Sequence, residues 1–125
     1  MTKYELGLER LRNILGSSAD EVIQHLHQIS PDFINYIIEF AYGDIYAREG
    51  ISDKTRELAA VANLIGQGIV GFPLKTHIQG MLNAGWSKNE IIEVIIYLIG
   101  YVGFPLTLEA MKTVHEVTEA HKITA

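Results

Sequence analysis

Hydrophobic and polar residues follow the period of an α-helix along almost the whole chain. Apolar positions recur three and four residues apart, and no stretch shows convincing two-residue alternation of the kind typical of a strand. Serine, glycine and proline mark the breaks between these runs. The pattern predicts an all-α fold, with helices over about 3–15, 18–29, 31–47, 53–67, 73–84, 91–102 and 105–120.

Two serines predict how helices begin. Ser18 precedes an acidic first turn, and we expect it to cap the helix that ends near residue 29. Ser87 and Glu90 have the spacing of a capping box, in which each side chain accepts a hydrogen bond from the other residue's backbone. In helix 31–47 most polar residues share one stripe, so we expect burial on several sides and most of its aromatic residues in the core.

The chain contains an internal repeat. The segment Gly68–Leu74 returns almost unchanged as Gly100–Leu106, and each copy lies between two predicted helices. The repeating unit is therefore a helix, a Gly-Pro break and a second helix. At the same offset after the break the first copy has His77 and the second has Glu109, a difference that a shared scaffold does not require.

Length and composition predict one compact domain spanning residues 1–125 that associates with other copies of itself. Of the 125 residues 48% are hydrophobic and 20% are charged, which is apolar for a monomer of this size. A net charge of −5 without a basic patch argues against nucleic acid as a partner. The absence of cysteine excludes disulfides and thiolate chemistry. Without a signal-like N-terminus or a run long enough to cross a bilayer, we expect a cytoplasmic protein that does not enter the membrane.

Glu57 is the first candidate for chemistry. On a helical wheel it lies within the arc formed by Leu58, Val61 and Leu64, so its carboxyl group points towards apolar surroundings. A carboxyl group in such a place can donate or accept a proton. The alternative is a first-turn glutamate that stabilises the helix N-terminus or pairs with Arg56.

His77 is the second candidate, at the edge of the apolar face that carries Leu74 and Met81. We expect it to be partly buried, where imidazole can exchange protons near neutral pH and a nearby buried glutamate would fix its tautomer. The alternative is a histidine that only fills a boundary position. The other histidines lack the spacing of a metal-binding pair, so we predict no metal site.

Tyrosine and arginine side chains supply candidate ligand contacts. Tyr42 and Tyr46 indicate either core packing or a cleft or subunit interface in which their hydroxyl groups find partners. Arg48 and Arg56 are cations close in sequence to the suspected helices, and a guanidinium group suits bidentate binding of a carboxylate. The alternative for both arginines is a solvated surface charge.

Several segments together resemble the carboxymuconolactone decarboxylase family. The resemblance covers nearly the whole chain, with a family core over about 30–120, and it implies an alkylhydroperoxidase D-like all-α fold. It also implies a ring-like homohexamer or trimer with sites near subunit contacts. The segments that carry it, in order, are Phe40–Tyr46, Thr55–Leu58, His77, Asn83–Gly85 and Gly103–Pro105.

The resemblance implies two chemistries, of which this chain retains the means for one. One branch of the family decarboxylates 4-carboxymuconolactone in the β-ketoadipate route of aromatic degradation, and the other reduces peroxides with a Cys-x-x-Cys pair before the histidine. Those cysteines correspond to Val70 and Pro73, so dithiol peroxidase activity is excluded. The Glu and His of that branch's proton relay correspond to Glu57 and His77. Where family decarboxylases tend to carry polar residues before the histidine, this chain has Gly71-Phe72-Pro73.

These expectations combine into a cofactor-free carboxy-lyase that acts on a small carboxylated lactone. His77 would protonate the carbanion-like centre, Glu57 would hold His77, and Arg56 or Arg48 would orient the substrate carboxylate. One alternative is a non-catalytic oligomeric protein that binds an apolar ligand. Another is a cysteine-free enzyme for a different small acid or lactone. The residues expected around the bound molecule are Tyr42, Tyr46, Phe72 and His77.

Overall fold

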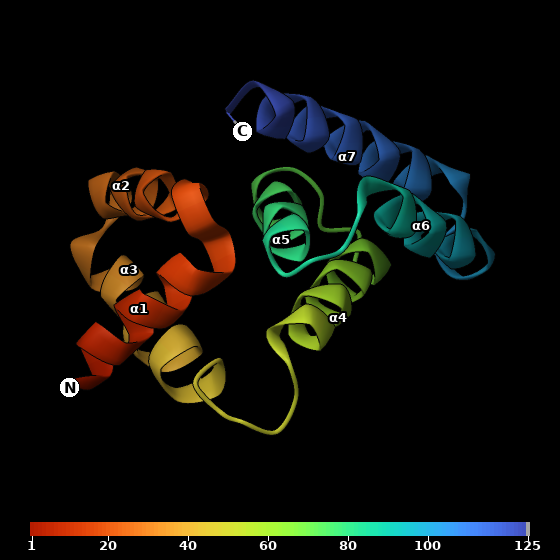
Figure 1. The fold of residues 1–125 in the computed structure, drawn as a ribbon. Helices are drawn as coiled ribbons and strands as arrows, with labels where there is room; N and C mark the ends of the chain where they lie inside the picture. The colour runs from red at the N-terminus through yellow and green to blue at the C-terminus, as the bar shows by residue number, and fades with distance from the viewer. Residues whose placement is uncertain (125) are drawn as a thin grey trace. The chain divides into compact units, whose positions relative to one another are not determined.

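Every regular element of residues 1–124 is helical, which confirms the predicted all-α class. The computed structural model describes the backbone of these residues and the side chains of residues 1–120. None of the helices described is long and apolar enough to cross a membrane. The elements in order (Figure 1) are α1 (Lys3–Leu15), η1 (Gly16–Ser18), α2 (Ala19–Ile29), α3 (Pro31–Tyr36), η2 (Ile37–Ile45), α4 (Asp53–Gly66), α5 (Phe72–Asn83), α6 (Lys88–Val102) and α7 (Phe104–Thr124).

The helices form two compact units, each with its own core. The first unit is Met1–Asp53, and the second begins at Lys54, in the first turn of α4. Each unit buries its own set of apolar side chains.

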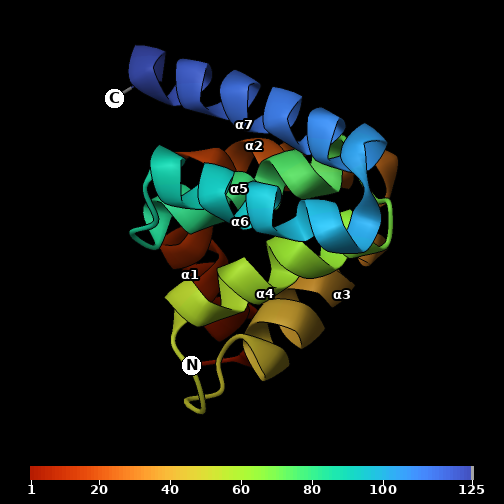
Figure 2. The same ribbon diagram turned by 90° about the vertical axis from the view of Figure 1, so that its right-hand side faces the viewer.

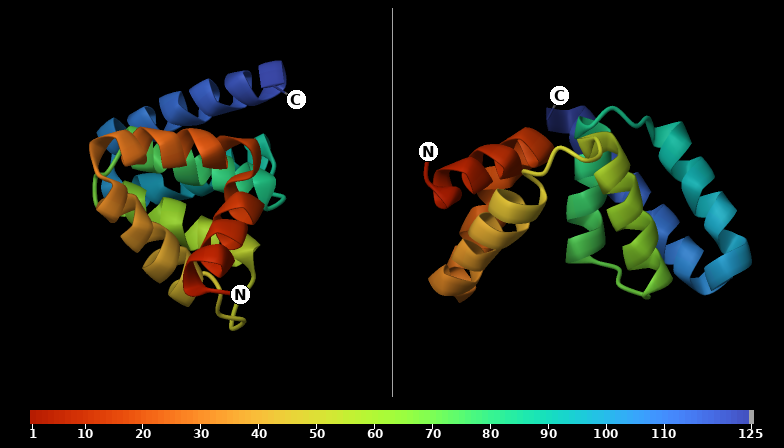
Figure 3. Two further views of the ribbon diagram at one scale, coloured as in Figure 1. Left: turned by 90° about the vertical axis from the view of Figure 1, so that its left-hand side faces the viewer. Right: turned by 90° about the horizontal axis from the view of Figure 1, so that it is seen from below.

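The first unit is built on the close approach of α1 and η2 (Figure 3). Gly7 permits this contact, because a Cβ atom at that position would overlap the carbonyl oxygen of Ile38 and lie 3.1 Å from the amide nitrogen of Gly43. Arg10 closes the end of the unit with two hydrogen bonds to Asp53 and one to the carbonyl of Tyr46. The core between the helices consists of Leu11, Ile14, Leu15, Ala19, Ile34, Ile38 and Tyr42.

The predicted continuous α-helix over 31–47 is wrong in its second half. After α3 the chain widens into the π-helix η2, which ends with a hydrogen bond from the amide of Tyr46 to the carbonyl of Ala41, five residues earlier, at 2.8 Å. The expected burial is also wrong for three aromatic residues of this segment. Phe33, Tyr36 and Phe40 are 54%, 70% and 62% exposed, because the other helices of the unit cover only the side that carries Ile34, Ile38 and Tyr42.

The two predicted serine caps have different outcomes. Ser18 lies in a 3₁₀ turn that runs directly into α2, and its backbone is already helical, so its side chain makes no capping hydrogen bond. Ser87 has the extended backbone of a true N-cap. Its hydroxyl accepts from the amide of Glu90 at 3.1 Å, and the carboxylate of Glu90 accepts from the amide of Ser87 at 3.0 Å, which confirms the capping box.

The second unit contains both copies of the repeat, as α4 followed by α5 and α6 followed by α7 (Figure 2). Each break needs a glycine because its backbone turns through a positive φ angle, which explains why the motif is repeated. Gly71 and Gly103 have φ angles of 86° and 84°, a left-handed conformation that residues with a Cβ rarely adopt. Each is followed at once by a helix that has proline near its start, at Pro73 and Pro105, where a missing amide hydrogen costs nothing.

The two copies differ where their first helices end. Helix α4 stops at Gly66, and the next turn closes with hydrogen bonds from Gly68 to Ile65 and from Ile69 to Leu64. In the second copy Gly100 remains helical and α6 continues to Val102. The core of this unit consists of Val61, Ile65, Leu74, Ile78, Met81, Ile91, Ile95, Ala110, Val114 and Val117.

Candidate functional site

Glu57 lies one turn into α4 and is completely buried. It occupies the face of the helix that also carries Val61 and Ile65, at the spacing of four and eight residues that aligns side chains along one side. The apolar arc predicted around Glu57 is therefore confirmed. A carboxylate in such surroundings requires a hydrogen-bonding partner, because burial removes its water.

His77 on α5 supplies such a partner. Its ring nitrogen Nδ1 lies 3.0 Å from Oε1 of Glu57, and 23% of its side chain remains exposed. The buried residues Leu74, Ile78 and Met81 hold α5 against the core and leave His77 at the edge of the apolar face, so its predicted partial burial is confirmed. The structure thus brings the two candidate residues together from neighbouring helices, α4 and α5 (Figure 3, right).

The contact assigns different tasks to the two nitrogens of His77. When Glu57 is ionised, its carboxylate can only accept a hydrogen bond, and Nδ1 of His77 then carries the hydrogen that it donates to Glu57. Nε2 is left for proton exchange with another molecule, and the group that orients the ring is itself fully buried. A histidine fixed by a buried carboxylate in this way can act as a general acid or base.

Trp86 fixes the start of α4 from the turn that follows α5. Its indole Nε1–H donates to the carbonyl oxygen of Lys54 at 2.8 Å, and the Nζ of Lys54 lies 4.5 Å from the centre of the indole ring. Lys54 is one turn before Glu57. The hydrogen bond therefore connects the turn after the helix that carries His77 with the start of the helix that carries Glu57.

Two of the predicted ligand contacts belong to the same unit as this pair. Arg56 precedes Glu57 on α4 and is partly buried. Phe72 is the first residue of α5, with 43% of its surface exposed. Their expected contacts with a substrate remain predictions.

The other three predicted contacts lie in the first unit. Tyr42, in η2, is buried, and its ring stacks on that of Tyr46 with the centroids 4.5 Å apart and the planes 14° apart. Tyr42 is the only one of the two tyrosines in the core of that unit, and Tyr46 packs against the core from its edge. Arg48 follows η2 and is exposed. Their roles also remain predictions.

Gly80 is a site residue that sequence reasoning missed. It is buried on α5, three residues after His77, and its position lies directly against the side chain of Glu57. The sequence offered a signal, because residues three apart on a helix share a face. That signal could not show that Glu57, on another helix, approaches this face.

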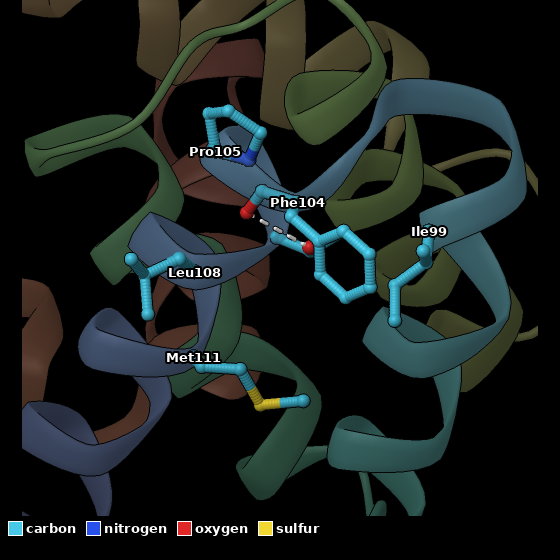
Figure 4. A pocket seen from close by; sticks show the side chains of 6 residues that line it. Ile99, Phe104, Pro105, Leu108 and Met111 are labelled. Atoms are coloured by element: carbon cyan, nitrogen blue, oxygen red, sulfur yellow. Dashed lines mark hydrogen bonds between the residues drawn. The ribbon is translucent and has the colours of Figure 1, made fainter.

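An apolar pocket lies between α6 and α7 (Figure 4), and its lining includes none of the predicted site residues. Its volume is about 520 Å³. The one hydroxyl group in its lining, that of Thr107, donates to the backbone carbonyls of Gly103 and Phe104 at 3.0 and 3.2 Å, so it is engaged with its own helix. A pocket of this kind suits an apolar molecule. It is lined by Ile99, Phe104, Pro105, Thr107, Leu108 and Met111.

The chain is similar to known decarboxylases. The model of the carboxymuconolactone decarboxylase family matches residues 31–116, a region that includes Glu57 and His77. The 4-carboxymuconolactone decarboxylase of Acinetobacter baylyi is 32% identical over 116 residues, which span 92% of this chain and 86% of that protein. The nitrosuccinic acid decarboxylase of Metarhizium robertsii is 26% identical over 121 residues, which span 93% of this chain and 84% of that protein.

Proposed function

This chain belongs to the carboxymuconolactone decarboxylase family, and from that premise we propose that it is a cofactor-free carboxy-lyase for a small carboxylated lactone. The observation that carries the proposal is the contact between Nδ1 of a partly exposed His77 and a fully buried Glu57. The names of the two decarboxylases among its relatives support the class of reaction.

In the proposed step the bond between the substrate carbon and its carboxylate breaks and carbon dioxide leaves. The bonding electrons enter the conjugated system of the lactone, and Nε2–H of His77 gives its proton to the carbanion-like centre. Because Nδ1–H stays with Glu57, the ring enters the step protonated on both nitrogens, and the Glu57 carboxylate balances its charge. The step needs no external oxidant or reductant.

A guanidinium group is proposed to orient the carboxylate that is lost. Arg56 is our first candidate because it precedes Glu57 on α4, and Arg48 is the second. Tyr42, Tyr46 and Phe72 are proposed to contact the rest of the substrate. The test replaces each arginine by methionine in turn. KM should rise in the variant that lacks the arginine in contact with the substrate carboxylate.

The proposal is tested by carbon dioxide release from a series of carboxylated lactones, beginning with 4-carboxymuconolactone. His77→Asn keeps a hydrogen-bond donor near Nδ1 for Glu57 but removes the exchangeable proton, so kcat should fall by about 100-fold or more. His115→Asn changes an exposed histidine of α7 and serves as the matched control. Unchanged turnover in a correctly folded His77→Asn protein would remove His77 from the mechanism.

We also propose that the protein acts as a homo-oligomer, a hexamer or trimer. This is supported by the exposed apolar residues of the second unit, where Tyr97, Tyr101, Phe104 and Leu108 are between 61% and 73% exposed. Light scattering coupled to size-exclusion chromatography tests the assembly. A strict monomer at micromolar concentration would contradict it.

A second candidate function is favoured by the apolar pocket between α6 and α7. Its volume is within the range of small-molecule sites, and its lining offers no charge to a carboxylate. A non-catalytic binding protein would use such a pocket. Binding of N-phenyl-1-naphthylamine that is lost in Met111→Arg, together with no turnover of any lactone, would favour this function over decarboxylation. Turnover limited to a different carboxylic acid would instead favour an enzyme for another small acid.

A further inference from the structure

The carboxylate of Glu57 fills the space that a side chain at position 80 would occupy. A Cβ atom built on Gly80 would overlap Oε1 of Glu57 and would lie 2.9 Å from Cδ and 3.2 Å from Cγ of the same side chain. Distances below about 3 Å between such atoms are not tolerated in a packed interior, so one group would have to move. All three close atoms belong to Glu57, so the glutamate is the group that an added methyl would displace.

Gly80 and His77 are presented by the same face of α5. Residues three apart on a helix lie one above the other, so the turn that positions His77 also places Gly80 beside it. Glu57 approaches this face from α4 and contacts His77 through Oε1, the atom that a methyl at position 80 would strike. The missing side chain and the hydrogen bond are therefore parts of one arrangement.

The scaffold itself does not require glycine at this position. In the second copy of the repeat, where Glu109 corresponds to His77, the residue that corresponds to Gly80 is Lys112. Lys112 is exposed and pairs with Glu109 at 3.7 Å. Gly80 also lacks the positive φ angle that explains the glycines of the breaks, and glycine disfavours the interior of a helix. Neither the repeated fold nor the backbone conformation requires glycine at position 80, whereas the contact with Glu57 does.

We infer that Gly80 is a positioning residue, whose missing side chain makes the space in which Glu57 reaches His77. The inference rests on the proposed function for its kinetic consequence. Its geometric part is the hydrogen bond between Glu57 and Nδ1 of His77, which can be measured without any substrate.

The test compares Gly80→Ala with Gly100→Ala. Gly100 lies within α6, and a Cβ atom there would meet nothing within 4 Å, so it is a matched helical control. Displacing by about 1 Å the carboxylate that holds the catalytic histidine can lower the rate about 100-fold. The kcat of Gly80→Ala should therefore fall by about that factor, with KM little changed. Nitrogen-15 NMR of the neutral imidazole should show the proton of His77 on Nδ1 in the parent and Gly100→Ala proteins, and largely on Nε2 in Gly80→Ala.

A double-mutant cycle with Glu57→Ala distinguishes positioning from a general structural role. If Gly80 acts through Glu57, Glu57→Ala/Gly80→Ala should have the same kcat as Glu57→Ala alone. If Gly80→Ala does not fold, the double variant should still fold as well as Glu57→Ala, because the clashing carboxylate is gone. Any of three results would overturn the inference. The first is a Gly80→Ala protein with the parent tautomer and kcat, and the second is an equal loss of kcat from Gly80→Ala in the parent and in Glu57→Ala. The third is a double variant that is less stable than Glu57→Ala.

The tautomer measurement separates this inference from the proposed function. Loss of the Nδ1 proton in Gly80→Ala, in a protein that turns over no carboxylated lactone, would refute the decarboxylase proposal and retain the positioning role. Turnover by the parent protein, together with an unchanged tautomer in Gly80→Ala, would support the decarboxylase proposal and refute the positioning role of Gly80.

Discussion

Trp86 donates its indole N–H to the carbonyl oxygen of Lys54 at 2.8 Å, and the ammonium group of Lys54 lies over the face of the same indole. Two contacts thus join the turn after α5 to the first turn of α4. They tie the start of the helix that carries Glu57 to the turn that follows the helix that carries His77, although neither Trp86 nor Lys54 takes part in the proposed chemistry.

Trp86→Phe should destabilise the protein by about 1 kcal/mol, because it removes the hydrogen bond and weakens the cation–π contact. Urea unfolding measures the change. Lys54→Met keeps the backbone carbonyl and removes only the charge, so it should cost less than Trp86→Phe. Equal losses in the two variants would mean that the cation–π contact, rather than the hydrogen bond, holds the helix start.

Glu57 and His77 should respond differently to removal because their burial differs. His77→Ala removes the imidazole hydrogen bond from a fully buried carboxylate and should cost about 2 kcal/mol at neutral pH. Glu57→Met leaves a histidine that water can still reach, and it replaces a buried carboxylate by an apolar chain of similar length. This variant should be as stable as the parent or about 1 kcal/mol more stable, although inactive.

Chemical denaturation of both variants measures this asymmetry. His115→Ala, on an exposed position of α7, is the control and should change stability very little. Equal destabilisation by His77→Ala and Glu57→Met would show that the buried carboxylate of Glu57 stabilises the fold and does not destabilise it.

The capping box at the start of α6 should make stability depend on pH. The backbone amide and hydroxyl of Ser87 lower the pKa of Glu90 from its ordinary value, in that order of importance. A carboxyl whose pKa is lowered by folding stabilises the native state above its unfolded pKa and loses that contribution as pH falls through the folded value. The difference in Tm between the parent and Glu90→Gln should therefore be largest above about pH 5 and shrink in acid.

Thermal unfolding between pH 3 and pH 7 tests this, with Glu93→Gln on the same helix as the control. Ser87→Ala should lower stability by about 1 kcal/mol, because it removes the N-cap itself. A Tm difference for Glu90→Gln that grows on acidification would contradict the assigned role of its carboxylate.

The apolar surface of the second unit should be sensitive to charge if it lies between subunits. Leu108→Glu places a carboxylate on the 61% exposed Leu108 and should dissociate the proposed oligomer, since an unpaired charge in an interface is expensive. Gln24→Glu, on an exposed position of α2, adds the same charge elsewhere and should leave the assembly intact. Masses from light scattering that are identical for the two variants would exclude Leu108 from any subunit contact.

Much of the local structure could be predicted from the sequence because it depends on neighbours along the chain. The capping box of Ser87 and Glu90 needs only residues three apart, and the burial of Glu57 follows from the apolar arc around it. The contact between Glu57 and His77 was anticipated as the fixing of a tautomer, and the structure supplies its geometry.

What the sequence could not predict depends on which surfaces meet. The widening of residues 37–45 into a π-helix leaves the apolar pattern almost unchanged, so periodicity did not distinguish it from an α-helix. Phe33 and Phe40 were expected in a core, but hydrophobicity alone does not say whether another helix of the same chain covers them. The role of Gly80 was invisible because it is set by a residue on a different helix.

The repeat provides an internal reference for every experiment on the site. Helix α7 carries Glu109 and Lys112 at the offsets where α5 carries His77 and Gly80, on an exposed surface of the same scaffold. Alanine at Glu109 and Lys112 measures what a change at these offsets costs on an exposed helix face. Any larger cost of the corresponding changes in α5 reflects burial against Glu57 together with chemistry, and the comparison is made within one molecule.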